Sequence, residues 1–166
     1  MSFNKLLLLM ILPLSQLPYI MSQVLQSGTY VVRNGDFEVG RNLREDRTLL
    51  PKPVVLGPDV QGTTLEIEQI GSEGNNYLIK ARGAPTANIN NLVSALLTNE
   101  ETAEEWRIEA VPQHGENRYI ITTQDQEEGW VAPDEPGAQI NCKPLISTKS
   151  FPPMYLPTEV FEIVSA

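Results

Sequence analysis

Short runs of alternating apolar and polar residues recur along the chain, and they have the two-residue period of β-strands. One pattern is a tyrosine followed by aliphatic residues, and it occurs in Tyr30-Val31-Val32-Arg33, Tyr77-Leu78-Ile79-Lys80 and Tyr119-Ile120-Ile121-Thr122. The other is a large apolar residue two positions before an isoleucine, with a charge between them; it occurs in Leu65-Glu66-Ile67, Trp106-Arg107-Ile108 and Phe161-Glu162-Ile163. We predict a strand at each place, with its apolar side on a core.

Between these markers each copy has room for two more strands. The second strands are predicted to begin near Phe37, Gly83 and Gly129, and the third strands near Pro53, Asn91 and Gln139. This gives an all-β fold of twelve short strands in three pseudo-repeats. A repeat of this size also occurs in propeller blades, but three blades are too few to close a ring. The predicted architecture is therefore a β-trefoil, a closed barrel with hairpin caps.

Two local features qualify this pattern. In the first copy, Asn34-Gly35 is predicted to form the tight turn of a hairpin, because both residue types accept positive φ. In the middle copy, residues 91–105 can instead form a short helix, since Leu92, Ala95 and Leu96 have helical spacing. The apolar pairs themselves can also recur by chance in an all-β protein.

Composition supports many short strands, since thirteen prolines and eleven glycines are typical of a chain with frequent turns. The length of 166 residues indicates one domain, which we place at residues 21–166. Residues 1–20 contain an apolar run of signal-peptide length after Lys5. Either they are a secretory leader and the protein is secreted, or translation starts at Met21 and the protein is cytoplasmic. Both interpretations put residues 1–20 outside the fold.

Charge and cysteine content exclude several partners. The formal net charge of -9 disfavours nucleic-acid phosphates and anionic membranes, which would repel the chain. Cys142 is the only cysteine, so the chain has no internal disulfide and no thiol-rich metal site. We expect Cys142 to be a buried strand residue and the protein to be a monomer.

Enzymatic chemistry finds little support in the available side chains. His114 is the only histidine and lies in a turn-like stretch, and no serine lies in a strained nucleophile elbow. The densest acidic run, residues 100–105, lacks the ligand spacing of a calcium loop, so we interpret it as a solvated face. We predict that the protein is not an enzyme and holds no metal and no cofactor.

A carbohydrate-binding, lectin-like trefoil is the alternative from a different functional class. Such a protein would typically display a Gln-x-Trp element in each repeat, and the chain has none. Trp106 and Trp130 occupy predicted strand positions, so we expect both to pack in the core. In the lectin hypothesis Trp130 would instead be an exposed platform for a sugar.

An unusual cationic stretch follows the first hairpin. Four of the twelve basic residues, Arg41, Arg44, Arg47 and Lys52, fall within it, although the chain as a whole is acidic. Residues 42–51 form a loop between two predicted strands, and loops with bulky charged side chains on a rigid scaffold usually carry function. A trypsin-like protease takes an exposed arginine into its specificity pocket, where a carboxylate pairs with the guanidinium.

Several stretches together resemble a known family. They are Ser27-Gly28-Thr29-Tyr30-Val31-Val32-Arg33-Asn34, Val39-Gly40-Arg41, Glu45-Asp46-Arg47-Thr48-Leu49-Leu50-Pro51-Lys52, Gly83-Ala84-Pro85-Thr86-Ala87, Gly129-Trp130-Val131 and Pro144-Leu145-Ile146. In order and spacing they resemble the fungal serine protease inhibitors of the cospin type, related in fold to the mycocypins, and the likeness covers nearly everything after residue 26. The resemblance implies a β-trefoil, no cofactor, and inhibition of trypsin-like serine proteases through one exposed loop.

By that resemblance the protease-binding loop consists of Arg44, Glu45, Asp46, Arg47, Thr48 and Leu49. We predict that Arg47 enters the specificity pocket and that its bond to Thr48 is presented to the protease, with Arg44 as the second candidate. Glu45 and Asp46 are poorly suited to trypsin-like subsites, but either can stiffen the loop by accepting backbone hydrogen bonds.

The middle copy contains a second candidate loop with Asn88, Asn90 and Asn91. Related fungal inhibitors oppose asparagine-specific cysteine proteases through such residues, and the resemblance extends that hypothesis to this chain. Asparagine is also a common turn former.

Overall fold

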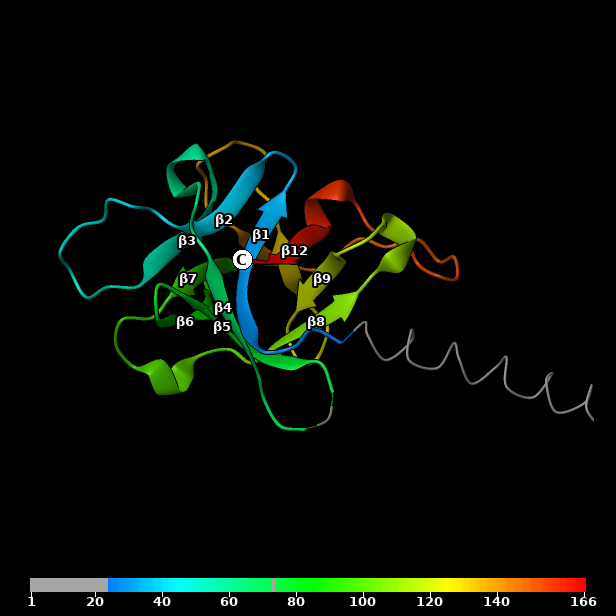
Figure 1. The fold of residues 1–166 in the computed structure, drawn as a ribbon, viewed down its shortest axis with the longest axis horizontal. Helices are drawn as coiled ribbons and strands as arrows, with labels where there is room; N and C mark the ends of the chain where they lie inside the picture. Colours follow the sequence, from blue (N-terminus) through cyan, green and yellow to red (C-terminus); the bar gives the residue numbers. More distant parts are fainter. Residues whose placement is uncertain (1–23, 73) are drawn as a thin grey trace, which may run out of the picture.

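The computed structural model describes residues 24–72 and 74–166, and within these ranges the chain forms twelve β-strands and four short 3-10 turns (Figure 1). The strands are β1 (Gly28–Asn34), β2 (Phe37–Arg41), β3 (Lys52–Gly57), β4 (Leu65–Gln69), β5 (Asn76–Ala81), β6 (Ala84–Ile89), β7 (Leu92–Ala95), β8 (Trp106–Ala110), β9 (Arg118–Thr122), β10 (Gly129–Val131), β11 (Asn141–Lys143) and β12 (Phe161–Ser165). The 3-10 turns are η2 (Pro58–Val60), η3 (Glu100–Thr102), η4 (Pro112–His114) and η5 (Pro157–Glu159). The leader or alternative start predicted for residues 1–20 lies outside the described residues.

Antiparallel pairing closes six strands into a ring. The order is β1, β4, β5, β8, β9 and β12, and β12 pairs with β1 again. A closed ring has no exposed strand edge, so the backbone groups of these strands are satisfied within the barrel. The prediction of an all-β fold is confirmed.

The other six strands form three hairpins, β2–β3, β6–β7 and β10–β11. The first strand of each hairpin also pairs with the ring strand that precedes it. The middle hairpin links the other two, because β7 pairs with both β3 and β11. The hairpins are thus held to the barrel and to one another, which makes their connecting loops well-anchored projections.

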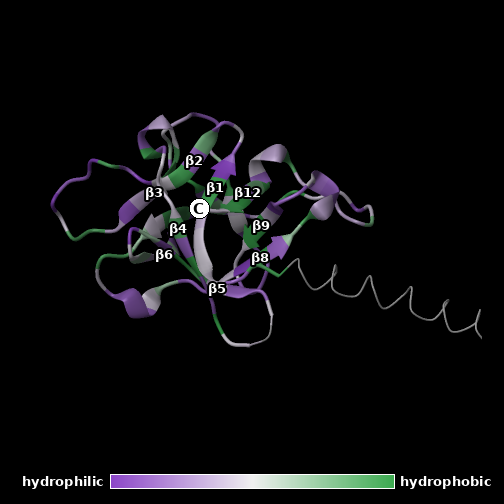
Figure 2. Cartoon of the chain, in the orientation of Figure 1, coloured by the Kyte–Doolittle hydropathy of each residue, from purple (hydrophilic) through white to green (hydrophobic). Residues whose placement is uncertain are grey.

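The apolar members of the sequence patterns build the core. Leu65, Ile67, Ile108 and Phe161 are at most 2% exposed, and the charged residues between the apolar pairs are less buried. Figure 2 shows the apolar residues gathered on the strands of the barrel, with polar residues on many of the connections. The predicted facing of these strands is confirmed.

Both tryptophans lie in this core with no measurable exposure. Trp130 meets Trp106 and Phe161 edge to face, with ring centroids 5.5 and 6.2 Å apart. These are favourable arrangements for aromatic quadrupoles. Cys142 is also fully buried, and burial raises the pKa of its thiol to about 12, with the Glu128 carboxylate as the next contributor. The prediction of core positions for these three residues is confirmed.

Two local expectations need adjustment. The first turn consists of Gly35 and Asp36, one position later than predicted, because Asn34 still pairs with Phe37 in the ladder. Gly35 supplies the positive φ of 61° that this turn requires. The helix considered for residues 91–105 is wrong: β7 occupies its first part, and only the single 3-10 turn η3 follows.

Candidate functional site: the loop between β2 and β3

The cationic stretch forms a loop that leaves the barrel between β2 and β3 and projects at one end of the molecule (Figure 1, cyan, left). Both of its ends are fixed in the sheet. Arg41 pairs with Val54 in the β2–β3 ladder, and Lys52 pairs with Ala95 of β7. The segment 42–51 therefore starts and ends on rigid supports.

Arg41 forms the first anchor at the base of the loop. Its guanidinium donates two hydrogen bonds to the Glu45 carboxylate, Nε to Oε2 at 3.1 Å and Nη2 to Oε1 at 2.5 Å, and Nη1 donates to the carbonyl oxygen of Ala81 at 3.2 Å. The side chains of Arg41 and Glu45 are only 8% and 12% exposed. A two-pronged pair of this kind fixes orientation as well as distance. Glu45 therefore points inward and holds the first half of the loop.

Lys52 forms the second anchor through Asp46. Its Nζ donates to Asp46 Oδ1 at 2.5 Å and to the Asp46 carbonyl oxygen at 3.3 Å. The same Oδ1 accepts hydrogen bonds from the Thr48 backbone N–H at 3.0 Å and from the Thr48 hydroxyl at 2.6 Å. As predicted, a loop carboxylate accepts a backbone hydrogen bond and stiffens the loop, and the residue is Asp46.

Arg82 of the neighbouring β5–β6 turn forms a third anchor. Its Nη1 donates to the carbonyl oxygen of Asn42 at 2.9 Å and lies 3.4 Å from Glu45 Oε1. The loop is thus held from its own two ends and from a separate hairpin. Arg41 and Arg82 pair with the nearly buried Glu45, and Lys52 pairs with the exposed Asp46, so both loop carboxylates act as braces.

Most other side chains of the loop face solvent. Arg44, Arg47 and Thr48 are exposed, and three leucines, Leu43, Leu49 and Leu50, are between 63% and 67% exposed. Within residues 24–72 and 74–166, neither Arg44 nor Arg47 takes part in an ion pair. Arg47 sits between Asp46 and Thr48, whose side chains bond to each other across it. The loop therefore presents the guanidinium of Arg47, available for a partner, on a fixed backbone with apolar side chains beside it.

The second predicted loop is arranged differently. Asn88 is the penultimate residue of β6, partly buried, and its Nδ2 donates to Glu128 Oε2 at 2.9 Å. Asn90 and Asn91 form the two-residue turn to β7, both with positive φ. The Asn91 carbonyl oxygen accepts a hydrogen bond from the Cys142 N–H at 2.8 Å. The three asparagines thus lie in a tight hairpin, and only the turn residues project.

The sequence analysis missed a third projecting segment, which connects β11 to β12 (Figure 1, orange, right). Phe151 at its tip is 99% exposed, and Lys149 beside it is also exposed. The signal was available as a proline-rich stretch without strand periodicity that carries a lysine. Only residues 144–146 of this connection contribute to the family resemblance.

Comparison with known proteins identifies the family. A family model described as Peptidase inhibitor I66 matches residues 21–165. The chain belongs to this family. It is a protease inhibitor, and not an enzyme.

Individual relatives agree with this assignment. A protein from Lentinula edodes named "Serine protease inhibitor" is 47% identical over 142 residues, which is 84% of this chain and 97% of the relative. The solved structure of a proteinase inhibitor from Coprinopsis cinerea matches with a TM-score of 0.77 and 34% identity, covering 86% of this chain and 99% of that one. BEL beta-trefoil, at 14% identity, matches with a TM-score of 0.51 over 84% of this chain and 95% of its own, which is a likeness of fold alone.

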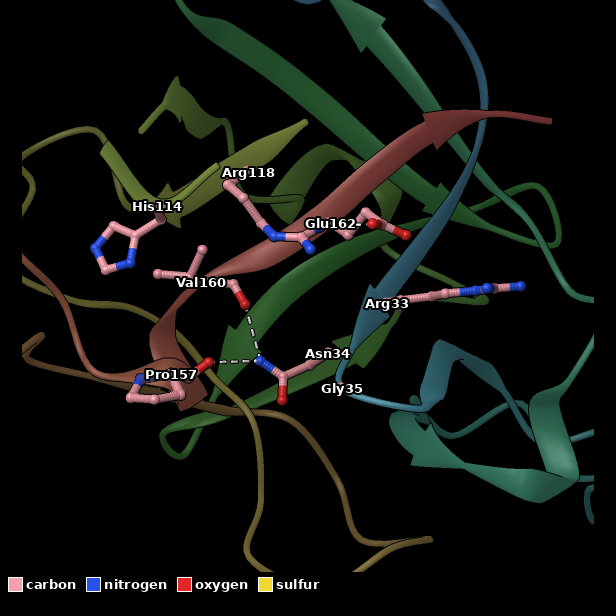
Figure 3. A pocket seen from close by; sticks show the side chains of 8 residues that line it. All are labelled: Arg33, Asn34, Gly35, His114, Arg118, Pro157, Val160 and Glu162. Atoms are coloured by element: carbon pink, nitrogen blue, oxygen red, sulfur yellow. Dashed lines mark hydrogen bonds and ion pairs between the residues drawn. The ribbon is translucent and has the colours of Figure 1, made fainter. Parts of the chain in front are cut away.

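The I66 inhibitor also has a surface cavity of about 280 Å³ on another side of the barrel (Figure 3). Its polar side chains already have partners: Asn34 Nδ2 donates to the carbonyl oxygens of Pro157 and Val160 at 2.9 and 2.8 Å. Arg118 pairs with Glu162 at 2.6 Å. Asn34 thus ties the first hairpin to the segment around η5, and Arg118 ties β9 to β12, so the polar side chains of this cavity join elements of the scaffold.

In residues 24–72 and 74–166, no three acidic, histidine or cysteine side chains lie close enough together to hold a metal ion. In the same residues, no helix has the length and apolar character needed to cross a membrane.

The hydrogen bonds of the Asp46 carboxylate predict the pH range over which the loop of the inhibitor stays braced. Hydrogen bonds from Lys52 and Thr48 lower the pKa of the Asp46 carboxyl from 3.8 to about 2. Because this pKa is depressed by folding, the brace stabilises the loop fully above pH 3.8 and is lost as the pH falls through about 2. We expect carbon-13 NMR of the Asp46 carboxyl to give a midpoint near pH 2, and Lys52→Met to move it upward. A wild-type midpoint near 3.8 would contradict the brace.

Proposed function

We propose that the chain inhibits trypsin-like serine proteases by inserting Arg47 into the specificity pocket and presenting the Arg47–Thr48 bond to the catalytic serine. The serine class of the target is taken from the name of the Lentinula edodes relative. The observation that carries the trypsin-like specificity is an exposed Arg47, without an ion pair among the described residues, held between two hydrogen-bonded neighbours. A guanidinium is the group that a pocket carboxylate binds in a two-pronged pair.

Preorganisation supports tight binding. A flexible loop would lose about 1–2 kcal/mol of backbone entropy for each residue ordered by the protease. Here the anchors from Arg41, Lys52 and Arg82 have already fixed the loop before it meets a partner. Most of the contact energy with the protease is therefore available as affinity.

The same bonds explain how the loop resists being consumed as a substrate. Asp46 lies before the Arg47–Thr48 peptide, whereas Thr48 and Lys52 lie after it, and all three are joined through Asp46 Oδ1. After cleavage, these bonds keep the new ends together and in place for resynthesis. The loop is then cleaved slowly and reversibly, so it occupies the active site of the protease and acts as an inhibitor.

The charges of the loop also fit an acidic specificity pocket. Glu45 is paired with Arg41 in a nearly buried position, and the exposed Asp46 carboxylate is paired with Lys52, so each negative charge has a cation beside it. The outward charge that remains is positive. These pairs weaken the repulsion that two carboxylates before Arg47 would exert on an acidic protease subsite.

The scaffold that we infer for this function is a monomeric β-trefoil of three pseudo-repeats, formed by residues 21–166. It is supported by the ring of six strands, by the three equivalently placed hairpins and by the β-trefoil neighbour. The lectin alternative is weaker, because Trp130, its candidate sugar platform, has no measurable exposure. The inhibition of asparagine-specific cysteine proteases through Asn90 or Asn91 remains a hypothesis for the second loop.

Titration of active trypsin with the full chain tests this function. We expect stoichiometric loss of activity and, on long incubation, slow clipping confined to basic residues of the projecting loops, with the Arg47–Thr48 bond among the products in mass spectrometry. Clipping after Arg44 in place of Arg47 would move the assignment to that residue. Undiminished trypsin activity at molar excess of the chain would overturn the trypsin-like specificity.

A further inference from the structure

The segment between β11 and β12 forms a closed loop with its own internal bracing. At its neck, Ser147 and Tyr155 form an antiparallel bridge, and the Thr148 N–H donates to the Met154 carbonyl oxygen at 2.9 Å. In return, the Met154 N–H donates to the Thr148 hydroxyl oxygen at 2.9 Å. The two arms are thus joined on both sides, and residues 149–153 are left as a short tip.

The tip is braced across Lys149. The hydroxyl oxygens of Thr148 and Ser150 are hydrogen-bonded at 2.6 Å, and the Ser150 hydroxyl is 3.1 Å from the carbonyl oxygen of Pro152. Lys149 itself is exposed and, in the part of the chain that the structure describes, forms no ion pair. Phe151, two positions later, is 99% exposed. A cation and a large apolar side chain are therefore displayed together on a fixed backbone.

The base of this loop is anchored by residues distant in sequence. The Tyr155 N–H donates to His114 Nε2 at 3.0 Å, and Gln113 Nε2 donates to the Pro153 carbonyl oxygen at 2.8 Å. Glu159, only 2% exposed, accepts hydrogen bonds from the N–H groups of Ile146 and Leu156 at 2.6 and 3.1 Å. The anchors come from η4 and η5, and none is shared with the β2–β3 loop.

Both projecting loops thus have the same local design. In each, a basic residue that forms no ion pair within residues 24–72 and 74–166 lies between two residues whose side chains hydrogen-bond to each other across it. These are Asp46 and Thr48 around Arg47, and Thr148 and Ser150 around Lys149. An isolated exposed lysine on a loop is ordinary. A lysine held in this arrangement, beside a fully exposed phenylalanine, has the features that make Arg47 a ligand for a protease pocket.

We propose that the β11–β12 loop is a second protease-binding site, in which Lys149 enters the pocket of another trypsin-like enzyme, so that one chain holds two protease molecules at once. The bond presented at this site is that between Lys149 and Ser150. Phe151 then lies beyond that bond and packs on the enzyme surface. The proposal rests on the proposed function for the class of partner, but it uses none of the residues of the first loop.

The placement of the two loops allows simultaneous binding. Figure 1 shows them at opposite sides of the barrel, the β2–β3 loop at the left and the β11–β12 loop at the right. Separation in a projection cannot exceed separation in space, so the whole barrel lies between the loops. Two globular enzymes can therefore approach from opposite directions without meeting.

Counting trypsin molecules per chain tests this inference. Full-length chain is mixed with catalytically inactive trypsin and measured by native mass spectrometry, while active trypsin is titrated in parallel. We expect two trypsins for the wild-type chain, one for Lys149→Glu, one for Arg47→Glu and none for the double variant. Lys143→Glu, which reverses an exposed charge on β11, is the matched control and is expected to keep two.

The outcomes separate the two proposals. One trypsin for both the wild-type chain and Lys149→Glu, with none for Arg47→Glu, would overturn the second site and leave the first. One trypsin for the wild-type chain, lost in Lys149→Glu, would overturn both the two-enzyme complex and the role of Arg47. No complex with the wild-type chain would overturn both proposals.

Discussion

Replacing Arg47 by glutamate is expected to raise the inhibition constant for trypsin about a thousandfold, or about 4 kcal/mol, in a chain that already carries Lys149→Glu. The variant loses the two-pronged pair with the pocket carboxylate and places a second carboxylate opposite it. Arg47 is exposed and forms no ion pair among the described residues, so we expect its replacement to leave the stability of the fold unchanged. The measurement is steady-state inhibition of trypsin at several inhibitor concentrations.

Two further variants make this result specific. Arg44→Glu, in the same background, also reverses a charge on the loop, and we expect it to weaken inhibition much less than Arg47→Glu. Circular dichroism should show an unchanged β spectrum and melting temperature for each. If Arg44→Glu has the larger effect, Arg44 is the residue that enters the pocket. If neither changes inhibition, the β2–β3 loop is not the binding site.

The strands could be predicted from the sequence because their signal is local. Leu65 and Ile67, or Phe161 and Ile163, are two positions apart, and in a strand that spacing alone puts both on one face. These residues are buried only because the barrel forms. Strands with one apolar face favour such a barrel, since closing it buries all of these faces together. The sequence places the first turn one residue too early, because Asn34 and Asp36 are equally suitable turn residues on either side of Gly35.

The sequence could not show which cations of the first loop anchor it and which face solvent, because this depends on tertiary structure. In the sequence, Arg41, Arg44, Arg47 and Lys52 are four similar cations in one stretch. In the structure, the first and last lie on strands, turn inward and neutralise the loop carboxylates, whereas the middle two face solvent. Which cation is an anchor and which is a ligand depends on where β2 ends and β3 begins.

The β11–β12 loop was missed for a related reason. Its anchors are His114 and Gln113, about forty positions before the residues that they bond, and the buried carboxylate of Glu159. The sequence predicts a turn at His114, which is correct, but it does not show what this turn contacts. Only the fold shows that this turn lies against Tyr155, with the ring centroids of His114 and Tyr155 6.0 Å apart.

Replacing Glu45 by alanine is expected to lower the free energy of unfolding by about 3 kcal/mol, because the buried Arg41 guanidinium then loses the carboxylate that compensates it. Arg41 keeps only its hydrogen bond to the Ala81 carbonyl oxygen, and Arg82 loses one of its two loop contacts. Chemical denaturation measures the stability. Glu116→Ala removes an exposed carboxylate and is expected to change stability by less than about 0.5 kcal/mol.

The same variant should also make the loop a better substrate. Without Glu45, the segment before Arg47 is no longer tied to Arg41, so the cleaved ends separate more readily and trypsin should clip the chain faster. A second substitution, Arg41→Met, removes the unpaired buried charge and should restore much of the stability without restoring the tie. Recovery of slow clipping together with stability would mean that the pair acts only through the fold. Stable but rapidly cleaved protein would show that Glu45 holds the loop in the form that inhibits.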